Sequence, residues 1–133
     1  MRQSKKFFTS SKEGFKKIGN TPPLTVAIPT YNRSRELSKT LRQLLKQNKE
    51  RFHILVSDDG STDSTEQMVT KLQKKYPNLF YHQNKINQGY SSNVCTLYEL
   101  AKTKYIWFLC DDDTVLSDSI KRFIAPSINI SPQ

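Results

Sequence analysis

"LTVAIPTYNRS", residues 24–34, joins an almost wholly apolar or β-branched run to a polar turn and then to a serine. A continuous apolar run such as 24–28 is typical of a strand covered on both faces, as in a parallel sheet. After the turn, Ser34 is suited to the N-cap of a helix. The apolar stripe of that helix has i, i+4, i+7, i+8 spacing and consists of Leu37, Leu41, Leu44 and Leu45. The stretch therefore predicts one strand followed by one helix.

The same strand pattern recurs at "FHILVS" (52–57), "LFYH" (79–82) and "YIWFLC" (105–110), so that strands begin every 26 to 28 residues. This is the length of one strand plus one helix, and such alternation predicts right-handed parallel crossovers. The fold class is therefore α/β, Rossmann-like, with about four mostly parallel strands. A chain of 133 residues suffices for one domain, which we place at 24–125 between a basic leader (1–23) and a tail (126–133).

The remaining helices are predicted from their caps and stripes. Asp63 and Glu66 have the spacing of a capping box. The buried stripe of that helix would consist of Met68, Val69, Leu72 and Tyr76, and the next helix would turn Val94, Leu97 and Ala101 inward. A short helix is expected at 117–124, with Pro126 ending it.

Composition limits the function classes. Hydrophobic residues make up 35% of the chain and charged residues 25%, no run of about 18 apolar residues occurs, and Cys95 and Cys110 lack metal-ligand spacing. A globular protein in a reduced, cytoplasmic setting is the default. Of the formal net charge of +9, residues 1–20 contribute six basic side chains against one acid. This leader is either a solvated segment or a contact to an anionic membrane surface, with the protein then peripheral to the membrane. No nucleic-acid-binding signature is present, so we expect no nucleic acid partner.

Three consecutive carboxylates, Asp111, Asp112 and Asp113, follow the fourth predicted strand. Like charges this close repel one another, so a partner is expected to offset the cost. A hard cation such as Mg²⁺ or Mn²⁺ is often held by one or two carboxylates together with substrate phosphates. The alternative is an acidic turn in which one aspartate caps the helix beginning near Ser117.

Every other unusual polar cluster also follows a predicted strand: "PTYNR", "DDGSTD" and "NQGYSSN". In open parallel sheets, ligands bind beyond the carboxyl ends of the strands, so one shared site is expected. Tyr31 could stack on a base or be an ordinary half-buried tyrosine, and Asp59 could accept a base N–H or begin a turn. Similarly, Asn87, Gly89 and Asn93 could approach phosphate or form a common loop. No dinucleotide fingerprint, P-loop or catalytic triad can be recognised.

Taken in order, "TVAIPTYNR", "VSDDGSTDST", "NQGYSSN" and "KYIWFLCDDD" resemble the N-terminal half of a family 2 glycosyltransferase with the GT-A fold, over about residues 24–125. The resemblance implies transfer of a sugar from a nucleoside diphosphate donor, typically UDP-linked, to an acceptor hydroxyl with inversion, assisted by Mn²⁺ or Mg²⁺. By position, Pro29 and Tyr31 would line the base pocket and Asp59 would bind the base. Asp112 would lie near the ribose, and Asp113, with Asp111 beside it, would hold the metal.

The chain departs from the family pattern in three places. Cys110 stands where a frequent family form has aspartate, and Asn93, Val94 and Cys95 stand where an arginine often contacts the pyrophosphate. Only 20 residues follow Asp113, so the acceptor site and the catalytic base are expected in a missing second half. The acceptor, saccharide or lipid-linked, is not indicated. One alternative is a truncated, non-catalytic nucleotide-binding or membrane-peripheral fragment. A phospho-acceptor domain is disfavoured because "PTYNR" is not acidic.

Overall fold

The computed structural model describes residues 21–47 and 51–130, with side chains described as far as residue 124. The leader predicted at 1–23 therefore lies almost wholly outside the described residues, as do residues 131–133 of the predicted tail. Among the helices of the described part, none combines the length and the apolar character that crossing a membrane requires.

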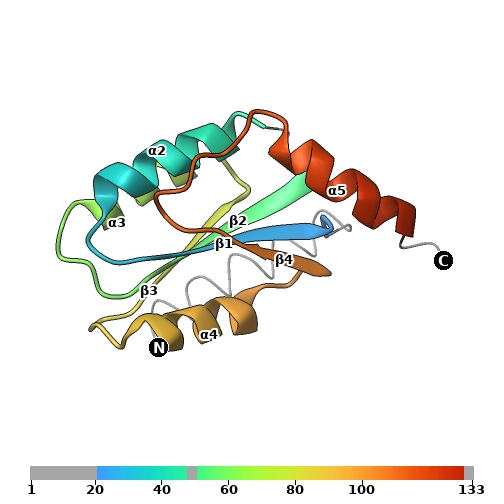
Figure 1. The fold of residues 1–133 in the computed structure, drawn as a ribbon. Coiled ribbons are helices and arrows are strands. Elements are labelled where there is room, and N and C mark those ends of the chain that lie inside the picture. The colour runs from blue at the N-terminus through green and yellow to red at the C-terminus, as the bar shows by residue number, and fades with distance from the viewer. Residues whose placement is uncertain (1–20, 48–50, 131–133) are drawn as a thin grey trace.

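Four parallel strands form one sheet with the order β3-β2-β1-β4 (Figure 1). They are β1 (Leu24–Thr30), β2 (Phe52–Asp58), β3 (Leu79–Gln83) and β4 (Tyr105–Phe108). In the register of the sheet, Leu24 lies beside Phe52 on one side and beside Tyr105 on the other. This arrangement confirms the predicted α/β class with parallel crossovers.

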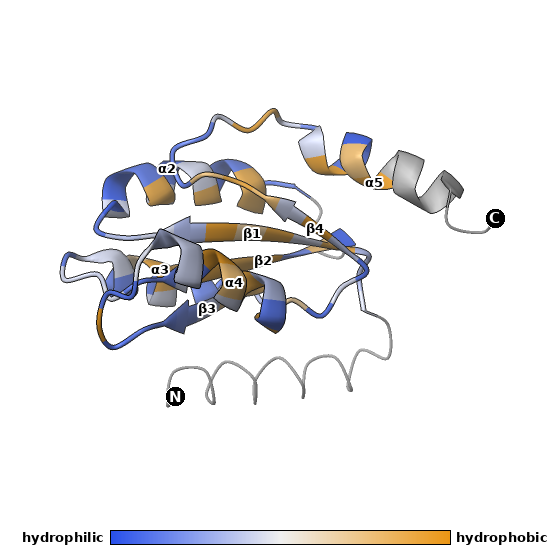
Figure 2. Cartoon of the chain, turned by 60° about the horizontal axis from the view of Figure 1, so that its bottom comes forward, coloured by the Kyte–Doolittle hydropathy of each residue, from blue (hydrophilic) through white to orange (hydrophobic). Residues whose placement is uncertain are grey.

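Helices cover both faces of the sheet (Figures 1 and 2). They are α2 (Ser34–Leu45), α3 (Thr65–Gln73), α4 (Tyr90–Leu100) and α5 (Ser119–Ile130). Alternate residues of each strand point to opposite faces. The larger core therefore joins Val26 and Ile28 of β1 to the predicted leucine stripe of α2, while Ala27 packs toward Leu97 and Leu100 of α4.

The order of the strands reverses between β1 and β4. The chain adds β2 and then β3 on one side of β1, and afterwards returns to place β4 on the other side. Crossovers on the two sides of such a switch point lie on opposite faces of the sheet, which opens a crevice at the carboxyl ends of the two strands. The crevice at the ends of β1 and β4 is therefore where the fold favours a ligand.

Two helix starts differ from prediction. Ser34 is the first residue of α2 and not its N-cap, and its N–H donates to Asp63 Oδ2 at 3.1 Å. The other oxygen, Asp63 Oδ1, accepts the backbone N–H of Thr65 at 3.0 Å, so the predicted capping box with Glu66 is wrong. The pattern failed because the loop brings this one carboxylate to two helix starts at once. Burial would raise the pKa of Asp63, but hydrogen bonds from the Thr65 hydroxyl and from the N–H groups of Thr65 and Ser34 outweigh it, and the pKa is lowered.

β4 is shorter and less covered than expected for a buried strand of 105–110. It ends at Phe108, its residues are half-buried, and the Phe108 side chain is exposed. The physical reason is that β4 lies at the sheet edge and pairs only with β1 within the described sheet.

The two later helices also differ in part. α4 buries Leu97 as predicted, but its other buried residues are Asn93 and Leu100, while Val94 is only half-buried and Ala101 is the C-cap. The backbone of α5 continues through Pro126, which contradicts the predicted stop. Proline removes only one intrahelical hydrogen bond donor, so a helix can continue past it at a cost in stability.

Candidate functional site

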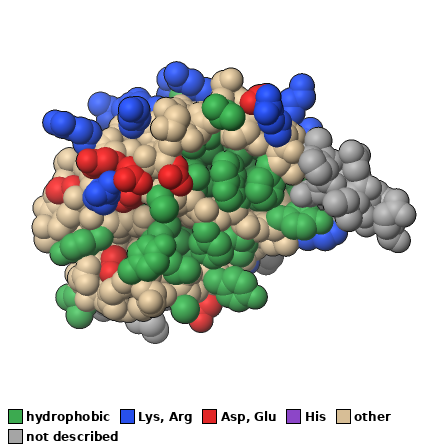
Figure 3. Space-filling view, in the orientation of Figure 1, with side chains coloured by type: hydrophobic (Ala, Val, Ile, Leu, Met, Phe, Trp, Pro, Cys, Tyr) green, Lys and Arg blue, Asp and Glu red, His purple; other side chains and the backbone are tan. Residues whose placement is uncertain are grey.

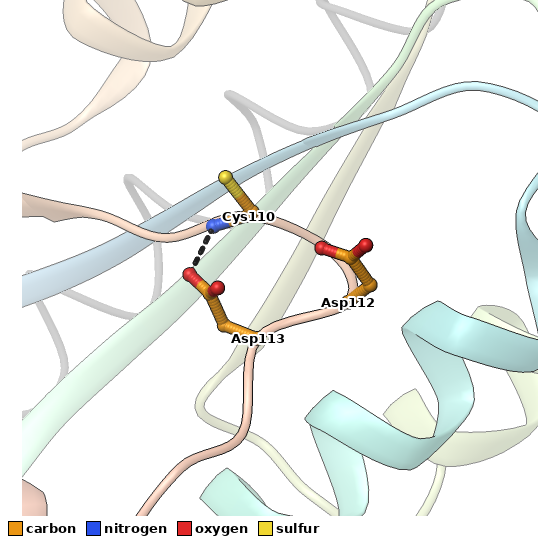
Figure 4. A group of neighbouring side chains, drawn as sticks. All are labelled: Cys110, Asp112 and Asp113. Carbon is orange, nitrogen blue, oxygen red and sulfur yellow. Dashed lines mark hydrogen bonds between the residues drawn. The ribbon is translucent and has the colours of Figure 1, made fainter.

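The acidic run begins where β4 ends. Leu109 extends the pairing by one hydrogen bond, from its N–H to the carbonyl of Ala27 at 2.9 Å. The chain then turns over Cys110–Asp113 (Figure 4), where the N–H of Asp113 donates to the carbonyl of Cys110 at 3.2 Å. The N–H of Cys110 in turn donates to Asp113 Oδ2 at 3.0 Å. This compact turn presents consecutive carboxylates at the carboxyl edge of the sheet.

The first carboxylate of the run is built into the protein. Asp111 is 8% exposed, and its Oδ2 accepts the hydroxyl of Thr30 at 2.9 Å. Its Oδ1 accepts Arg33 Nε at 3.0 Å. Burial raises the pKa of Asp111 even though Thr30 and Arg33 favour the ionised form. Asp111 thus ties the acidic turn to the end of β1.

The second and third carboxylates are exposed to solvent. Asp112 Oδ2 accepts Arg33 Nη2 at 2.9 Å. Thr40 of α2 holds the backbone of the turn. Its buried hydroxyl lies 2.8 Å from the carbonyl oxygen of Asp111 and 3.1 Å from that of Asp113. The backbone of the turn is therefore held in place, while the side chains of Asp112 and Asp113 remain exposed.

Cys110, Asp112 and Asp113 each offer a ligand atom, and these atoms lie within 4.8 Å of one another (Figure 4). Burial and the neighbouring acids raise the pKa of the Cys110 thiol, so the thiol is protonated at neutral pH and is a poor ligand. Two exposed carboxylates remain. This oxygen donor set fits a hard cation such as Mg²⁺ or Mn²⁺, which typically keeps other positions for water and phosphate.

A cavity of about 350 Å³ adjoins this turn at the switch point. Its lining comes from the end of β1, the first turns of α4 and the end of β4, and consists of Pro29, Tyr90, Ser91, Val94, Phe108, Leu109 and Cys110. Its volume lies in the range of small-molecule sites. Figure 3 shows hydrophobic side chains gathered beside a group of acidic side chains on one face of the molecule. Of the predicted base-pocket pair, Pro29 lines the cavity, and Tyr31 is 44% exposed at the same strand end.

The acidic pair at the end of β2 has different surroundings. Asp59 is 2% exposed and accepts the N–H groups of Gln88 and Gly89, both at 2.8 Å, and Asn84 Nδ2 at 2.9 Å. The fully buried Asp58 accepts the N–H of Ser61 at 2.9 Å and the hydroxyl of Tyr81. Both carboxylates are therefore engaged by the protein itself.

The predicted phosphate-side residues are spread over the loop and the helix that follow β3. Asn87 is exposed, and Gly89, with a φ of 102°, directs its N–H to Asp59. Asn93 is 2% exposed and pairs with Ser57 of β2: its Oδ1 accepts the hydroxyl at 2.6 Å, and its Nδ2 donates to the carbonyl at 2.9 Å. Asn93 therefore fastens α4 to the sheet.

Three residues with a part in the site were not assigned from the sequence: Thr30, Arg33 and Thr40. Arg33 carried a usable signal, because a cation just after β1 must lie at the same sheet edge as the acids after β4. Thr40 carried none, since a threonine within a helix is not recognisable as an anchor for a loop about 70 residues away.

The comparisons agree with this geometry. Residues 25–129 match the family model described as "Glycosyl transferase family 2". A GalNAc(5)-diNAcBac-PP-undecaprenol β-1,3-glucosyltransferase of Campylobacter jejuni is 35% identical over 74% of this chain and 32% of its own length. An abequosyltransferase of Salmonella typhimurium is 33% identical over 73% of this chain and 30% of its own. The chain thus spans about a third of the length of these relatives.

Solved structures show the same fold. S. aureus TarS in complex with UDP-GlcNAc superposes with a TM-score of 0.72 at 31% identity, over 77% of this chain and 30% of that one. A mannosyltransferase from Pyrobaculum calidifontis, in complex with GDP-Man and Mn²⁺, has a TM-score of 0.66 at 18% identity, over 88% of this chain and 39% of its own, a likeness of fold alone. By its sequence match, its parallel sheet and the acidic turn at the switch point, the chain belongs to glycosyltransferase family 2.

Proposed function

We propose that the chain forms the donor-binding part of an inverting glycosyltransferase that transfers a sugar from a nucleoside diphosphate, with UDP as the first choice, to an acceptor hydroxyl. The observation that carries this proposal is the exposed pair Asp112 and Asp113 beside a 350 Å³ cavity at the switch point. The complex of the relative TarS with UDP-GlcNAc supports the choice of nucleotide.

The surroundings of each predicted residue indicate its part in the proposed site. Pro29 lines the cavity and the exposed Tyr31 ring can cover a base from the end of β1. Asp113 would hold Mg²⁺ or Mn²⁺, and Asp112, whose ligand atom lies within 4.8 Å of that of Asp113, would share the ion and lie near the ribose. Asp111, the second predicted metal ligand, would act from behind by fixing Arg33 and the turn, because both of its oxygens accept hydrogen bonds from the protein.

Four further residues are predicted to contact the donor, and their surroundings support that role to different degrees: Asp59, Asn87, Gly89 and Asn93. A direct bond from Asp59 to a base N–H requires one of its three protein donors to give way. Its supporting role is to hold the backbone of Gln88 and Gly89 at the site. Asn87 is exposed on the same loop and free to approach a ligand, whereas Asn93 acts through the placement of α4.

Chemically, the reaction breaks the bond between the anomeric carbon and the diphosphate oxygen while an acceptor oxygen attacks from the opposite face, with loss of its proton to a base. A bound divalent cation would stabilise the negative charge that develops on the leaving diphosphate. The described residues hold and orient the donor, and we assign the catalytic base to none of them. The acceptor, the cytoplasmic location and the contact of residues 1–20 with an anionic membrane remain predictions.

Calorimetric titration of the chain with UDP, in Mn²⁺ and then in EDTA, tests the proposal. We expect binding that depends on the metal and that Asp113→Ala weakens at least about tenfold, because the ion loses a ligand. Asp118→Ala is the matched control, since it removes an acid paired with Arg122 on another turn. UDP binding by Asp113→Ala with unchanged metal dependence would show the assignment of Asp113 to be wrong.

A further inference from the structure

Arg33 bridges the buried and the exposed members of the acidic run. Its Nε donates to Asp111 Oδ1 at 3.0 Å, and its Nη2 donates to Asp112 Oδ2 at 2.9 Å. The Asp111 side chain is 11% exposed, the Asp112 side chain 54% and the Arg33 side chain 43%. One end of the guanidinium is therefore anchored at a buried acid, and the other end reaches an acid in solvent.

The carboxylate of Asp112 has two competing partners, a divalent ion and the guanidinium of Arg33. It is one of the carboxylates whose oxygens converge with those of Asp113, and it is also the outer partner of Arg33. A divalent ion and a guanidinium on the same carboxylate repel each other, so binding of one weakens binding of the other. An arginine guanidinium stays protonated at any working pH, so Arg33 keeps its charge whether or not a metal is bound.

We infer that Arg33 is the internal counter-cation of the acidic run and becomes the phosphate-contacting cation once a metal takes Asp112. This inference rests on the proposed function. At the positions where the family often has an arginine, this chain has Asn93, Val94 and Cys95, so those positions supply no cation for a diphosphate. A guanidinium held at Asp111 through Nε keeps its Nη donors for a phosphate beside the metal, and guanidinium groups bind phosphate in this planar manner.

The inference predicts effects of opposite sign for Arg33→Gln. Mn²⁺ alone should bind about three- to tenfold more tightly, because a competing positive charge has gone. UDP at saturating Mn²⁺ should bind about tenfold more weakly, because a charge-assisted bond to phosphate is lost. Arg33→Lys should restore part of the UDP affinity. A residue that only supported the shape of the turn would weaken both.

The experiment counts free Mn²⁺ by electron paramagnetic resonance in the full chain and measures UDP by calorimetry at saturating Mn²⁺. Arg35→Gln is the matched control: it makes the same change of charge two residues along, on an exposed part of α2 that lines the cleft toward α3. We expect that control to shift either affinity less than about twofold, as for a screened surface charge.

The possible results distinguish a failure of the inference about Arg33 from a failure of the proposed metal site. If Arg33→Gln weakens Mn²⁺ binding, or behaves like Arg35→Gln, the inference is wrong while the metal site stands. If the wild-type chain binds no Mn²⁺ that Asp113→Ala removes, the proposed metal site fails and the inference fails with it. Tighter Mn²⁺ binding together with weaker UDP binding supports the inference.

Discussion

Two runs of aspartate follow strands of the same sheet, yet they have opposite environments. Asp58, the last residue of β2, and Asp59, which follows it, are 0% and 2% exposed, and protein donors occupy their oxygens. After β4, only Asp111 is buried, and Asp112 and Asp113 face solvent. The first run holds the protein together, and the second is available to a ligand.

The position of the strand explains this difference. β2 lies between β1 and β3, and the loop after β3 folds back over its end with two backbone N–H groups aimed at Asp59. β4 is an edge strand whose following turn is held mainly from one side, by Thr30, Arg33 and Thr40. Similar sequences thus acquire different roles from their neighbours.

The largest contrast should appear in stability. Asp59→Asn can keep only one accepting oxygen and turns an N–H₂ group toward backbone donors, so we expect a loss of about 3 kcal/mol in the free energy of unfolding. Asp112→Asn loses only an exposed ion pair and should change it by less than about 0.5 kcal/mol. Urea denaturation measures both. Equal losses would erase the distinction between the two runs.

A pH titration of stability distinguishes the effect of a buried core histidine from the effects of the two acidic runs. Burial lowers the pKa of His53 to about 4, against an ordinary value of 6.5. The unfolded chain therefore binds a proton that the folded chain refuses, and stability falls as the pH drops from 6.5 toward 4. The expected contribution is about 3 kcal/mol. The slope of unfolding free energy against pH should be shallower in His53→Gln, and an unchanged slope would assign the acid sensitivity to the carboxylates.

The turn after β2 should tolerate a side chain less well than the turn before α4. Gly60 has a φ of 83°, and a Cβ there would lie 2.9 Å from Asn87 N and 2.9 Å from the carbonyl carbon of Ile86. Gly89 has a φ of 102°, but nothing lies within 4 Å of its Cβ position. We expect Gly60→Ala to cost about 2 kcal/mol and Gly89→Ala about 1 kcal/mol, as backbone strain alone would. Thermal unfolding checks the order, and the reverse order would mean that the loop yields easily.

The smallest effect concerns the support beneath the exposed acids. Thr40→Val keeps the volume but removes the hydroxyl beneath the carbonyls of Asp111 and Asp113, with an expected loss of about 1 kcal/mol. Mn²⁺ affinity should fall a few-fold, as when a supporting hydrogen bond is removed. Thr96→Val is the control, because its hydroxyl donates to the carbonyl of Ser92 within α4 and to no other group among the described residues. Unchanged Mn²⁺ affinity in Thr40→Val would show that the turn holds its shape alone.

The sequence predicted the regular part of the fold well. The apolar runs predicted the strands, the leucine stripe predicted α2, and the alternation of strands and helices predicted that the strands run parallel. These patterns can be recognised because hydrophobic periodicity reflects which residues are buried. It did not predict that Asp63 would begin two helices, or that Arg33 would pair with acids about 80 residues away. These contacts depend on which loops the finished sheet brings together. The edge position of β4, which decides the exposure of Asp112, is a property of strand order and not of any local pattern.

The most direct test locates the ion. Crystals of the chain soaked with MnCl₂ and UDP, measured for the anomalous signal of manganese, would show which carboxylates hold it. We expect a peak in direct contact with Asp113, with Asp112 beside it and Arg33 turned toward the phosphates. A peak at Asp58 or Asp59, or none near the acidic turn after β4, would contradict it.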